Sequence, residues 1–438
     1  MSWLKKAIPP KIKNILGKVK KNIPEGLWQK CPSCQTVLYG TDLEKNNYVC
    51  QNDQYINRMN FEFTEEQLMI KDAARDYAQR ELIQDVTERD EKSIFPEKHI
   101  KNLAELGFMG MMVDPEYGGS GMDTISYVLV MEELSKVDAS VSVIVSVNNS
   151  LVCFGLNKFG SEEQKHKYLT PLAMGEVIGA FLLSEPEAGS DATHQHTTAE
   201  DKGDYYLLNG TKNWITSANS ASTYIVIAQT YPEKRHKGIN AFIVEKNSPG
   251  ISLGPHEDKM GMRSSDTHSV MFTDVKVPKE NRIGKDGFGF KFAMKVLEAG
   301  RIGIAAQALG LASGALERAT AYSKERKAFG TELANHQSVA FKLADMAVKI
   351  ENARNLCLKA AWLKDNNKQI TIASAMAKQY SADMAMEVTT EAVQIHGGYG
   401  YVKEYHVERL MREAKLTQIY EGTSEVQKIV ISRDVLKD

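Results

Sequence analysis

Cysteine, net charge and long apolar runs are all scarce in this sequence. Its 438 residues include only five cysteines, three of them within the first 50 residues, which is typical of a metal site and not of a secreted disulfide framework. No run approaches the roughly 20 uninterrupted apolar residues that cross a bilayer, and the start lacks the apolar core of a signal peptide. The formal net charge is only -2, so nothing demands a nucleic-acid partner. We therefore expect a cytoplasmic globular protein without a membrane or nucleic-acid partner.

The character of the sequence changes along the chain, and 438 residues are too many for one simple core. Residues 1–21 hold seven lysines and no acidic residue, and a cysteine-containing segment follows them up to residue 58. Good helix formers dominate residues 60–175, strand-like runs dominate 176–288, and helical character returns over 289–438. We therefore predict a basic arm with a small separate segment, then a helical domain, a β domain and a second helical domain.

Three local patterns support this division. Thr64 is followed three residues later by Gln67, a capping-box pattern that opens a helix. Asn209-Gly210 lies between two strand-like runs and predicts a two-residue hairpin turn. Between residues 339 and 360, apolar residues recur at alternating steps of four and three, which places Cys357 on the core face of a long helix.

Two patterns in the predicted β region suit a flat or polar ligand. Residues 181–191 run from a strand into a loop with Gly189 and Ser190, where amides and a hydroxyl can donate hydrogen bonds. In Trp214-Ile215-Thr216, an indole can cover a flat ring and a hydroxyl can bond a ring nitrogen. Each pattern also has an ordinary explanation, since strands commonly end in such turns and a strand tryptophan is commonly a core residue.

A third pattern combines residues 326–330 and Gln337 with residues 394–398. Arg326 can neutralise a phosphate through its planar fork, and the paired glycines that follow His396 allow close backbone approach, such as to a pyrophosphate. The segment is not a dinucleotide fingerprint, because it lacks the strand-to-helix glycine context. His396 by itself is better explained as a structural histidine than as a base.

The fourth pattern is Ile419-Tyr-Glu-Gly-Thr-Ser-Glu425. It places the carboxylate of Glu421 beside a flexible glycine and two hydroxyl residues. The same residues also fit a helix N-cap turn.

In this order, the four patterns resemble the acyl-CoA dehydrogenase family over essentially everything from residue 60 to 438. Three further motifs make the sequence look most like the short-chain (butyryl) members: Val147-Asn-Asn-Ser150, Asp258-Lys-Met-Gly-Met-Arg263 and Glu298-Ala-Gly-Arg-Ile-Gly303. The resemblance implies a mostly α fold with an N-terminal helical domain, a barrel-like middle β domain and a C-terminal four-helix bundle. It also implies FAD as cofactor, a short-chain acyl-CoA as substrate, electron-transfer flavoprotein as acceptor, and at least a dimer, usually a homotetramer.

The resemblance also assigns roles to individual positions. The flavin is expected at Phe181, Leu182, Leu183, Ser184, Ser190, Trp214, Ile215 and Thr216. The adenine dinucleotide half is expected, partly across a subunit boundary, at Arg326, Gln337, Gln394, Ile395, His396, Gly397, Gly398, Thr423, Ser424 and Glu425. The acyl-CoA is expected at Ser190, Glu298, Ala299, Gly300, Arg301 and Gly422.

Glu421 is expected to be the catalytic base. The resemblance implies that it takes the α-proton of the thioester while flavin accepts the β-hydride, giving a trans-2-enoyl-CoA. Some members of the family place the base immediately before the arginine that corresponds to Arg301, where this chain has Gly300, and glycine cannot abstract a proton. Two alternatives stay open: an oxidase-like flavoenzyme that oxygen reoxidises, and a non-catalytic binding protein on this fold.

The first 58 residues have a separate character. Their potential ligands reproduce the spacing of a four-ligand zinc ribbon, except that the last is aspartate: Cys31, Cys34, Cys50 and Asp53. Residues 1–55 resemble the N-terminal ribbon of the acetyl-CoA carboxylase carboxyltransferase β subunit, without the catalytic domain of that subunit. The pattern fits a zinc-holding docking module and a decayed site alike.

Overall fold

The structure is a computed structural model that describes residues 28–30, 37–39 and 62–437. The chain forms two compact units, Met1–Met69 and Ile70–Asp438. In the first unit, strands β1 (Trp28–Lys30) and β2 (Val37–Tyr39) pair antiparallel. The predicted zinc ligands Cys31, Cys34, Cys50 and Asp53 lie outside the described residues.

Helices form the segment that precedes the large sheet. Helix α3 (Glu65–Arg80) begins with the predicted capping box, in which Thr64 and Gln67 exchange hydrogen bonds of 3.0 and 3.1 Å. The helices that follow are α4 (Val86–Lys92), α5 (Glu97–Glu105), α6 (Thr124–Ser135), α7 (Ala139–Ser146), α8 (Phe154–Phe159), α9 (Glu162–Gln164) and α10 (Thr170–Met174). A π-helical segment, Val147–Cys153, joins α7 to α8.

The stretch Ala139–Phe159 is long and apolar enough to cross a membrane by length and composition. Within the structure 94% of its most apolar window is buried, as in the core helix of a folded domain. Three asparagines interrupt its apolar character, and two of them, Asn148 and Asn149, are buried. Asn148 and Asn149 donate hydrogen bonds of 2.8 Å to the carbonyls of Met109 and Phe108, so their burial leaves no amide donor unsatisfied at these positions.

The middle region is a seven-stranded sheet made of β3 (Gly179–Leu182), β4 (Thr198–Asp201), β5 (Tyr205–Thr216), β6 (Thr223–Gln229), β7 (Ile239–Glu245), β8 (Ile251–Leu253) and β9 (Thr267–Pro278). The order is β3-β6-β4-β5-β9-β8, and β7 pairs with β6. Strands β3 and β4 run parallel to β6, whereas the other pairs are antiparallel. All seven positions of β6 are buried, which makes it the central strand of this core.

The predicted hairpin turn at Asn209-Gly210 is wrong, because β5 runs through both residues. The register with β9 shifts between Leu208 and Gly210, so the pair forms a β-bulge instead of a turn. Gly210 has a φ of 140°, and a Cβ at this position would lie 2.6 Å from the Cα of Thr197. Asn209 braces the bulge through bonds of 3.0 and 2.8 Å to the side chain and the main-chain N–H of Asp274 on β9.

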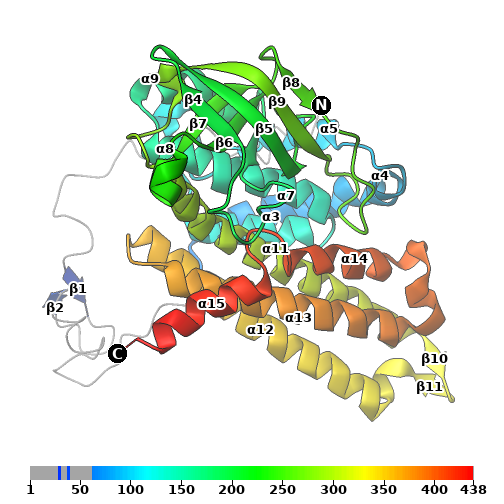
Figure 1. Ribbon diagram of the computed structural model, residues 1–438. Helices are drawn as coiled ribbons and strands as arrows, with labels where there is room; N and C mark the ends of the chain where they lie inside the picture. The colour runs from blue at the N-terminus through cyan, green and yellow to red at the C-terminus, as the bar shows by residue number, and fades with distance from the viewer. Residues whose placement is uncertain (1–27, 31–36, 40–61, 438) are drawn as a thin grey trace. The chain divides into compact units, whose positions relative to one another are not determined.

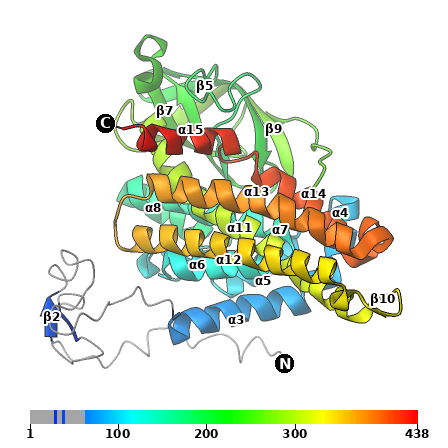
Figure 2. The same ribbon diagram turned by 90° about the horizontal axis from the view of Figure 1, so that it is seen from below.

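The C-terminal region consists of α11 (Gly289–Glu325), α12 (Gln337–Asp365), α13 (Thr371–His396), α14 (Val407–Thr417) and α15 (Ser424–Val435). A short antiparallel pair, β10 (Lys327–Ala328) and β11 (Thr331–Glu332), follows α11. Helices α11, α12 and α13 lie side by side, and α11 also packs against α6 (Figure 2). The sheet is drawn in green above α11, with the orange and red C-terminal helices below it (Figure 1).

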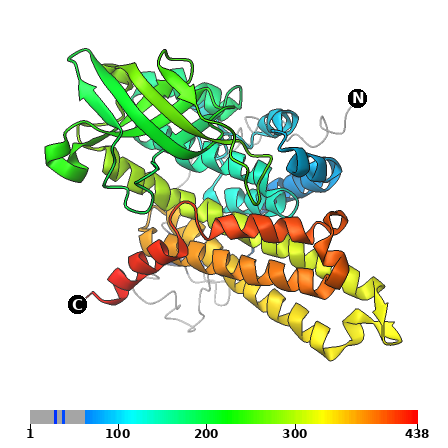
Figure 3. The ribbon, with the colours of Figure 1, turned by 45° about the vertical axis from the view of Figure 1, so that its right-hand side comes forward.

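The predicted core face of α12 is confirmed. Cys357 is fully buried, together with Met346, Ile350, Ala353 and Ala360. The predicted order of helices, sheet and helices, with a mostly α composition, is confirmed as well (Figure 3).

Candidate active site

The turn between α14 and α15 carries Glu421. Glu421 and Gly422 have φ values of 50° and 91°, and a non-glycine residue in this region needs support from its surroundings. Lys378 on α13 donates from Nζ to the Gly422 carbonyl at 2.7 Å. Gln427 on α15 donates to the same carbonyl at 2.9 Å. Two side chains from different helices therefore hold the peptide group that joins Gly422 to Thr423.

Asp383 on α13 fixes the two ends of the same turn. Its Oδ1 accepts hydrogen bonds from Gln418 at 2.7 Å and from the Ser424 hydroxyl at 2.9 Å. Thr423 caps α15 by accepting from the N–H of Val426 at 3.2 Å. The N-cap explanation from the sequence is thus correct for Thr423, and the Glu421 carboxylate takes no part in the cap.

The carboxylate of Glu421 is buried without a partner. Neither of its oxygens accepts a hydrogen bond from any residue that the structure describes. Burial raises the pKa of Glu421 to about 7, against the opposing effect of the positive charges of Lys378 and Arg301. A carboxyl group with this pKa exchanges its proton near neutral pH, as a general base must.

Gly300 on α11 makes the space that the carboxylate occupies. A Cβ at this position would lie 2.2 Å from Oε2 of Glu421 and 2.8 Å from Cδ2 of Leu151. Any side chain here would therefore expel the carboxylate or shift the helix. From the sequence, Gly300 is expected to contact the acyl-CoA and is excluded as a competing base. The geometry adds a steric reason for the glycine.

The neighbours of Gly300 on α11 have different surroundings. Arg301 is buried, and its Nε and Nη1 have no hydrogen-bond partner among the described residues. Burial lowers the pKa of Arg301. The carboxylate of Glu298 already accepts bonds of 2.7 Å from Thr371 and 2.8 Å from Lys295. Ala299 is buried.

Hydroxyl groups lie on the same side of α11 as Glu421, because those of Tyr127 and Ser146 are beside Gly303, one turn along the helix from Gly300. The Tyr127 hydroxyl on α6 and Oγ of Ser146 are 2.9 Å apart. Burial raises the pKa of Tyr127, and the negative charge of Glu421 adds to that rise. The Tyr420 hydroxyl, next to the base in sequence, donates to the side-chain oxygen of Gln307 on α11.

The residues predicted to hold the flavin ring lie where the loop after β3 meets a second bulge in β5. The N–H of Asn213 donates to the carbonyl of Ser184 at 2.9 Å. The register with β9 shifts between Lys212 and Ile215, and Trp214 there has a φ of 60° and a side chain that is 62% exposed. This strand tryptophan is therefore not a core residue. Phe181, Leu183, Ser184 and Thr216 are partly buried, Leu182 and Ile215 are buried, and Ser190 is exposed.

A buried ion pair fixes this loop. Lys212 donates from Nζ to the Leu183 carbonyl at 2.9 Å and to the Glu185 carboxylate at 2.7 Å. Glu185 also accepts from the main-chain N–H groups of His196 and Thr197 at 2.6 and 3.1 Å. Burial lowers the pKa of Lys212 to about 8. Burial alone would raise the pKa of Glu185, but the Lys212 charge and the donated hydrogen bonds lower it.

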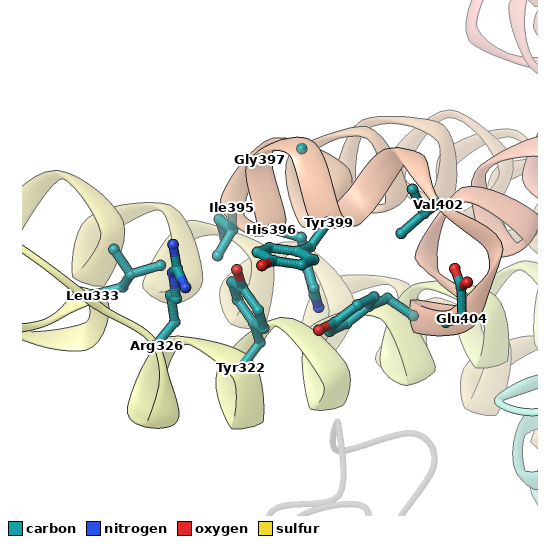
Figure 4. Close-up of a pocket in the computed structure, with 11 residues that line it drawn as sticks. Tyr322, Arg326, Leu333, Ile395, His396, Gly397, Tyr399, Val402 and Glu404 are labelled. Carbon is teal, nitrogen blue, oxygen red and sulfur yellow. The ribbon is translucent and has the colours of Figure 1, made fainter.

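A cavity of about 810 Å³ lies near the C-terminal end of α11 (Figure 4). Its lining includes the predicted dinucleotide residues Arg326, Ile395, His396, Gly397 and Gly398, with Tyr322, Leu333, Tyr399, Val402, Glu404 and Tyr405. The ring of His396 stacks on Tyr322 at 4.3 Å and donates from Nδ1 to the Ala392 carbonyl at 2.8 Å, which fits a structural histidine. Gln337 and Gln394 are exposed and do not line this cavity.

Arg326 and Glu421 lie far apart within one chain. Gly300, which touches Glu421, and Arg326 are 26 positions apart on α11 and its C-cap. At 1.5 Å per residue this is roughly 39 Å. Thr423, Ser424 and Glu425 instead line a separate cavity of about 440 Å³ beside Asp383 and Lys428.

Sequence reasoning missed Lys378. The available signal was its position on one helical face with Ser374, Ser381 and Ala385, at steps of four, three and four. All four residues are buried in the structure. Lysine is almost never fully buried unless it is paired, so a lysine among small residues on one helical face indicates a buried partner for its ammonium group.

Three family models match the chain in order. They are Acyl-CoA dehydrogenase, N-terminal domain (residues 64–176), middle domain (residues 180–275) and C-terminal domain (residues 287–436). A fourth, Acetyl-CoA carboxylase zinc finger domain, matches residues 28–52.

Individual proteins agree with these models. The short-chain specific acyl-CoA dehydrogenase of Clostridium acetobutylicum is 50% identical over 379 residues, 86% of this chain and 100% of that protein. The structure of butyryl-CoA dehydrogenase from Megasphaera elsdenii is 49% identical with a TM-score of 0.85, covering 86% and 100% of the two chains. A chain in a structure of the electron transferring flavoprotein of Acidaminococcus fermentans is 52% identical with a TM-score of 0.86, covering 87% and 100%. Since all three models match in order and half-identical relatives align over their whole length, this chain belongs to the acyl-CoA dehydrogenase family.

Proposed function

We propose that this protein dehydrogenates a short-chain acyl-CoA thioester to the trans-2-enoyl-CoA, with Glu421 as the catalytic base. The observation that carries the proposal is the Glu421 carboxylate, buried without a hydrogen-bond partner among the described residues and with its pKa raised to about 7. A desolvated base that titrates near neutrality suits the removal of a weakly acidic α-proton. The short-chain preference rests on relatives described as short-chain specific and butyryl-CoA dehydrogenases.

The turn supplies more than the carboxylate. Removal of the α-proton places negative charge on the thioester oxygen, which needs a hydrogen-bond donor held in place. The main-chain N–H of Glu421 belongs to the turn that Lys378, Gln427 and Asp383 fix, so we assign it this role. Bound FAD supplies the acceptor for the hydride that leaves the β-carbon.

The residues present fit FAD. The exposed Trp214 is aimed out of its strand by a bulge, as a ring-covering indole requires. At Gly397 and Gly398 an added Cβ would meet nothing within 4 Å, so the cavity beside the Arg326 guanidinium is open to a phosphate group. Because Arg326 and Gly300 are roughly 39 Å apart along α11, we propose that Arg326 serves the FAD of a second copy, within a homotetramer.

The remaining assignments have separate support. Electron-transfer flavoprotein is proposed as the electron acceptor because a half-identical chain occurs in a structure of an electron transferring flavoprotein. Zinc at Cys31, Cys34, Cys50 and Asp53 is proposed from the zinc finger match, which ends at residue 52, just before Asp53. Domain limits at 1–58, 60–175, 176–288 and 289–438 and a cytoplasmic location stay predictions from the sequence.

Replacement of the base tests the function. Glu421→Gln keeps the size of the side chain but cannot take up the α-proton, so we expect yellow, FAD-loaded protein whose bleaching by butyryl-CoA is slowed by roughly 10²–10⁴-fold. The measurement is anaerobic stopped-flow absorbance of the flavin. Glu351→Gln, on the surface of α12, should match the wild type. Full activity of Glu421→Gln would refute the assignment, and steady peroxide release by the wild type would favour an oxidase.

A further inference from the structure

Lys378 is a fully buried lysine on α13 whose hydrogen bond goes to a neutral group. Its side chain is 0% exposed, and Nζ donates to the main-chain carbonyl of Gly422 at 2.7 Å. Burying an ammonium group is costly unless it is paired, so a position of this kind requires a specific reason. The bonded carbonyl belongs to the residue that directly follows the base.

We infer that Lys378 is the positioning residue for Glu421: its ammonium group holds the turn that carries the base and keeps a positive charge buried beside the base's carboxylate. The inference rests on the proposed function, because it requires Glu421 to be the base. It adds a residue 43 positions away in sequence that acts through Glu421 and not on the substrate.

The backbone of the turn that carries Glu421 needs support from other elements. Glu421 and Gly422 both have positive φ values, and a turn of this kind persists only when its surroundings hold it. The Gly422 carbonyl accepts hydrogen bonds from Lys378 on α13 and Gln427 on α15, so it connects both helices to the turn. Gln427 could supply a neutral hydrogen bond alone, so the lysine contributes something that an amide cannot, namely its charge.

Charged groups from several helices surround Lys378 and Glu421. The charges that act on Lys378 come from Glu421 in the turn, Asp383 on α13, Arg301 on α11 and Glu425 on α15. The charges that act on Glu421 are those of Lys378 first and Arg301 second, and the neutral hydroxyls of Tyr127 and Tyr420 lie within the field of the base.

The direction of the effect is fixed by these charges. A nearby cation favours the ionised form of a carboxyl group, so the ammonium of Lys378 lowers the pKa of Glu421 that burial raises. Burial lowers the pKa of Lys378 to about 8, above the value of about 7 for Glu421. Without the ammonium group, Glu421 would bind its proton more tightly.

The test replaces Lys378 in the FAD-loaded enzyme and follows flavin reduction by butyryl-CoA from pH 5.5 to 9.5. Lys378→Met keeps the length of the side chain but removes its charge and its hydrogen bond. We expect the acid limb of the rate profile to move up by about one pH unit or more, so that the loss of rate is at least about tenfold greater at low pH than at high pH. Lys378→Arg retains a charge and should return the limb towards its wild-type position.

The outcomes separate positioning from mere structural support. A rate lowered equally at every pH, with an unmoved acid limb in Lys378→Met, would overturn the inference. Lys349→Met, which removes a partly exposed α12 lysine bonded to Glu387, should leave the profile unchanged. If Lys378→Met does not fold, Lys378→Gln replaces it, and an unmoved limb in that variant is equally fatal. If wild-type flavin is not reduced, or if Glu421→Gln keeps the full rate, the proposed function fails and not this inference alone.

Discussion

At the scale of single residues, the absence of a side chain at Gly300 is as specific as the presence of the carboxylate at Glu421. The two residues are 121 positions apart, yet an ideal Cβ at Gly300 would overlap Oε2 of Glu421 at 2.2 Å. The position of the Glu421 carboxylate therefore depends on the absence of a side chain at Gly300. A change at either position alters where the proton acceptor stands relative to the thioester.

Gly300→Ala should cripple the enzyme without abolishing its fold. The added methyl group displaces the Glu421 carboxylate, and a misplacement of about 1 Å can cost roughly 10²-fold in rate. Stopped-flow flavin reduction by butyryl-CoA measures this loss.

Gly310→Ala is the matched control on the same helix. Its Cβ would lie 2.4 Å from the Glu132 main-chain carbonyl oxygen, an overlap with backbone at a site remote from the base. Both variants should melt at lower temperature, but only Gly300→Ala should lose its rate per folded, flavin-loaded molecule. Equal losses in the two variants would show that Gly300 matters only for helix packing.

At the scale of elements, the two bulges in the β5–β9 pair, the first with its extra residue on β9 and the second with its extra residue on β5, decide which side chains β5 presents. The bulge at Asn209-Gly210 keeps the strand paired with β9, and the bulge between Lys212 and Ile215 turns Trp214 outward. Local sequence signals predicted the strand residues but took Asn-Gly for a turn. The error arises because the positive φ of Gly210 suits a bulge as well as a turn, and only pairing with a distant strand distinguishes the two.

Lys212→Met should detach the loop after β3 from this strand. It leaves the buried Glu185 carboxylate without its cation, and breaking a buried pair in this way costs about 3–5 kcal/mol of folding stability. The loop that carries Ser184 then loosens, so FAD should also dissociate more readily. Chemical denaturation and flavin retention on gel filtration measure the two effects.

Lys276→Met is the control for this strand pair. Lys276 is an exposed residue of β9, and its replacement should change stability by less than about 0.5 kcal/mol. If both variants retain FAD and stability alike, the ion pair does not hold the loop.

Patterns within one element were predictable from the sequence, and contacts between elements were not. The capping box at Thr64 and the core face around Cys357 follow from spacing along one helix, and both are confirmed. The bonds from Lys378 to Gly422 and from Lys212 to Glu185 join residues 44 and 27 positions apart, which no local pattern encodes. Glu421 was found from its motif, whereas its missing hydrogen-bond partner became visible only in three dimensions.

At the scale of the whole molecule, the length of α11 separates the two ends of the proposed cofactor site. Gly300 lies beside the base, and Arg326 lines the cavity near the other end. Under the proposed function, a single chain therefore carries residues for both halves of the cofactor site, and we propose that the two halves serve different FAD molecules. This arrangement suits an assembly in which each copy completes the site of another.

Mixed assemblies test this arrangement. Glu421→Gln and Arg326→Glu chains should each be nearly inactive alone, because the first lacks the base and the second repels the dinucleotide phosphates. When the two chains are co-expressed in equal amounts, half of the pairs are hybrids. In each hybrid, one site combines an intact Glu421 with an intact Arg326 from the other chain, and the second site carries both defects. We therefore expect about a quarter of the wild-type rate.

The control mixture pairs two defects in the same part of the chain. Glu421→Gln co-expressed with Gly300→Ala damages the base region of every copy, so no hybrid has a sound site. No recovery in the first mixture, or equal recovery in both, would contradict a site shared between copies.

The unpartnered carboxylate of Glu421 also couples proton binding to folding. Its pKa is 4.5 in the absence of structure and about 7 in the folded chain, so between these values the folded state holds a proton that the unfolded state has released. Its contribution to stability is complete below pH 4.5 and fades as the pH rises through about 7, a change of up to about 3 kcal/mol. The contribution of Glu421 to folding stability is thus greatest when its carboxyl group is protonated and cannot accept the α-proton. The fold loses that contribution over the same pH interval in which the base becomes able to accept the α-proton.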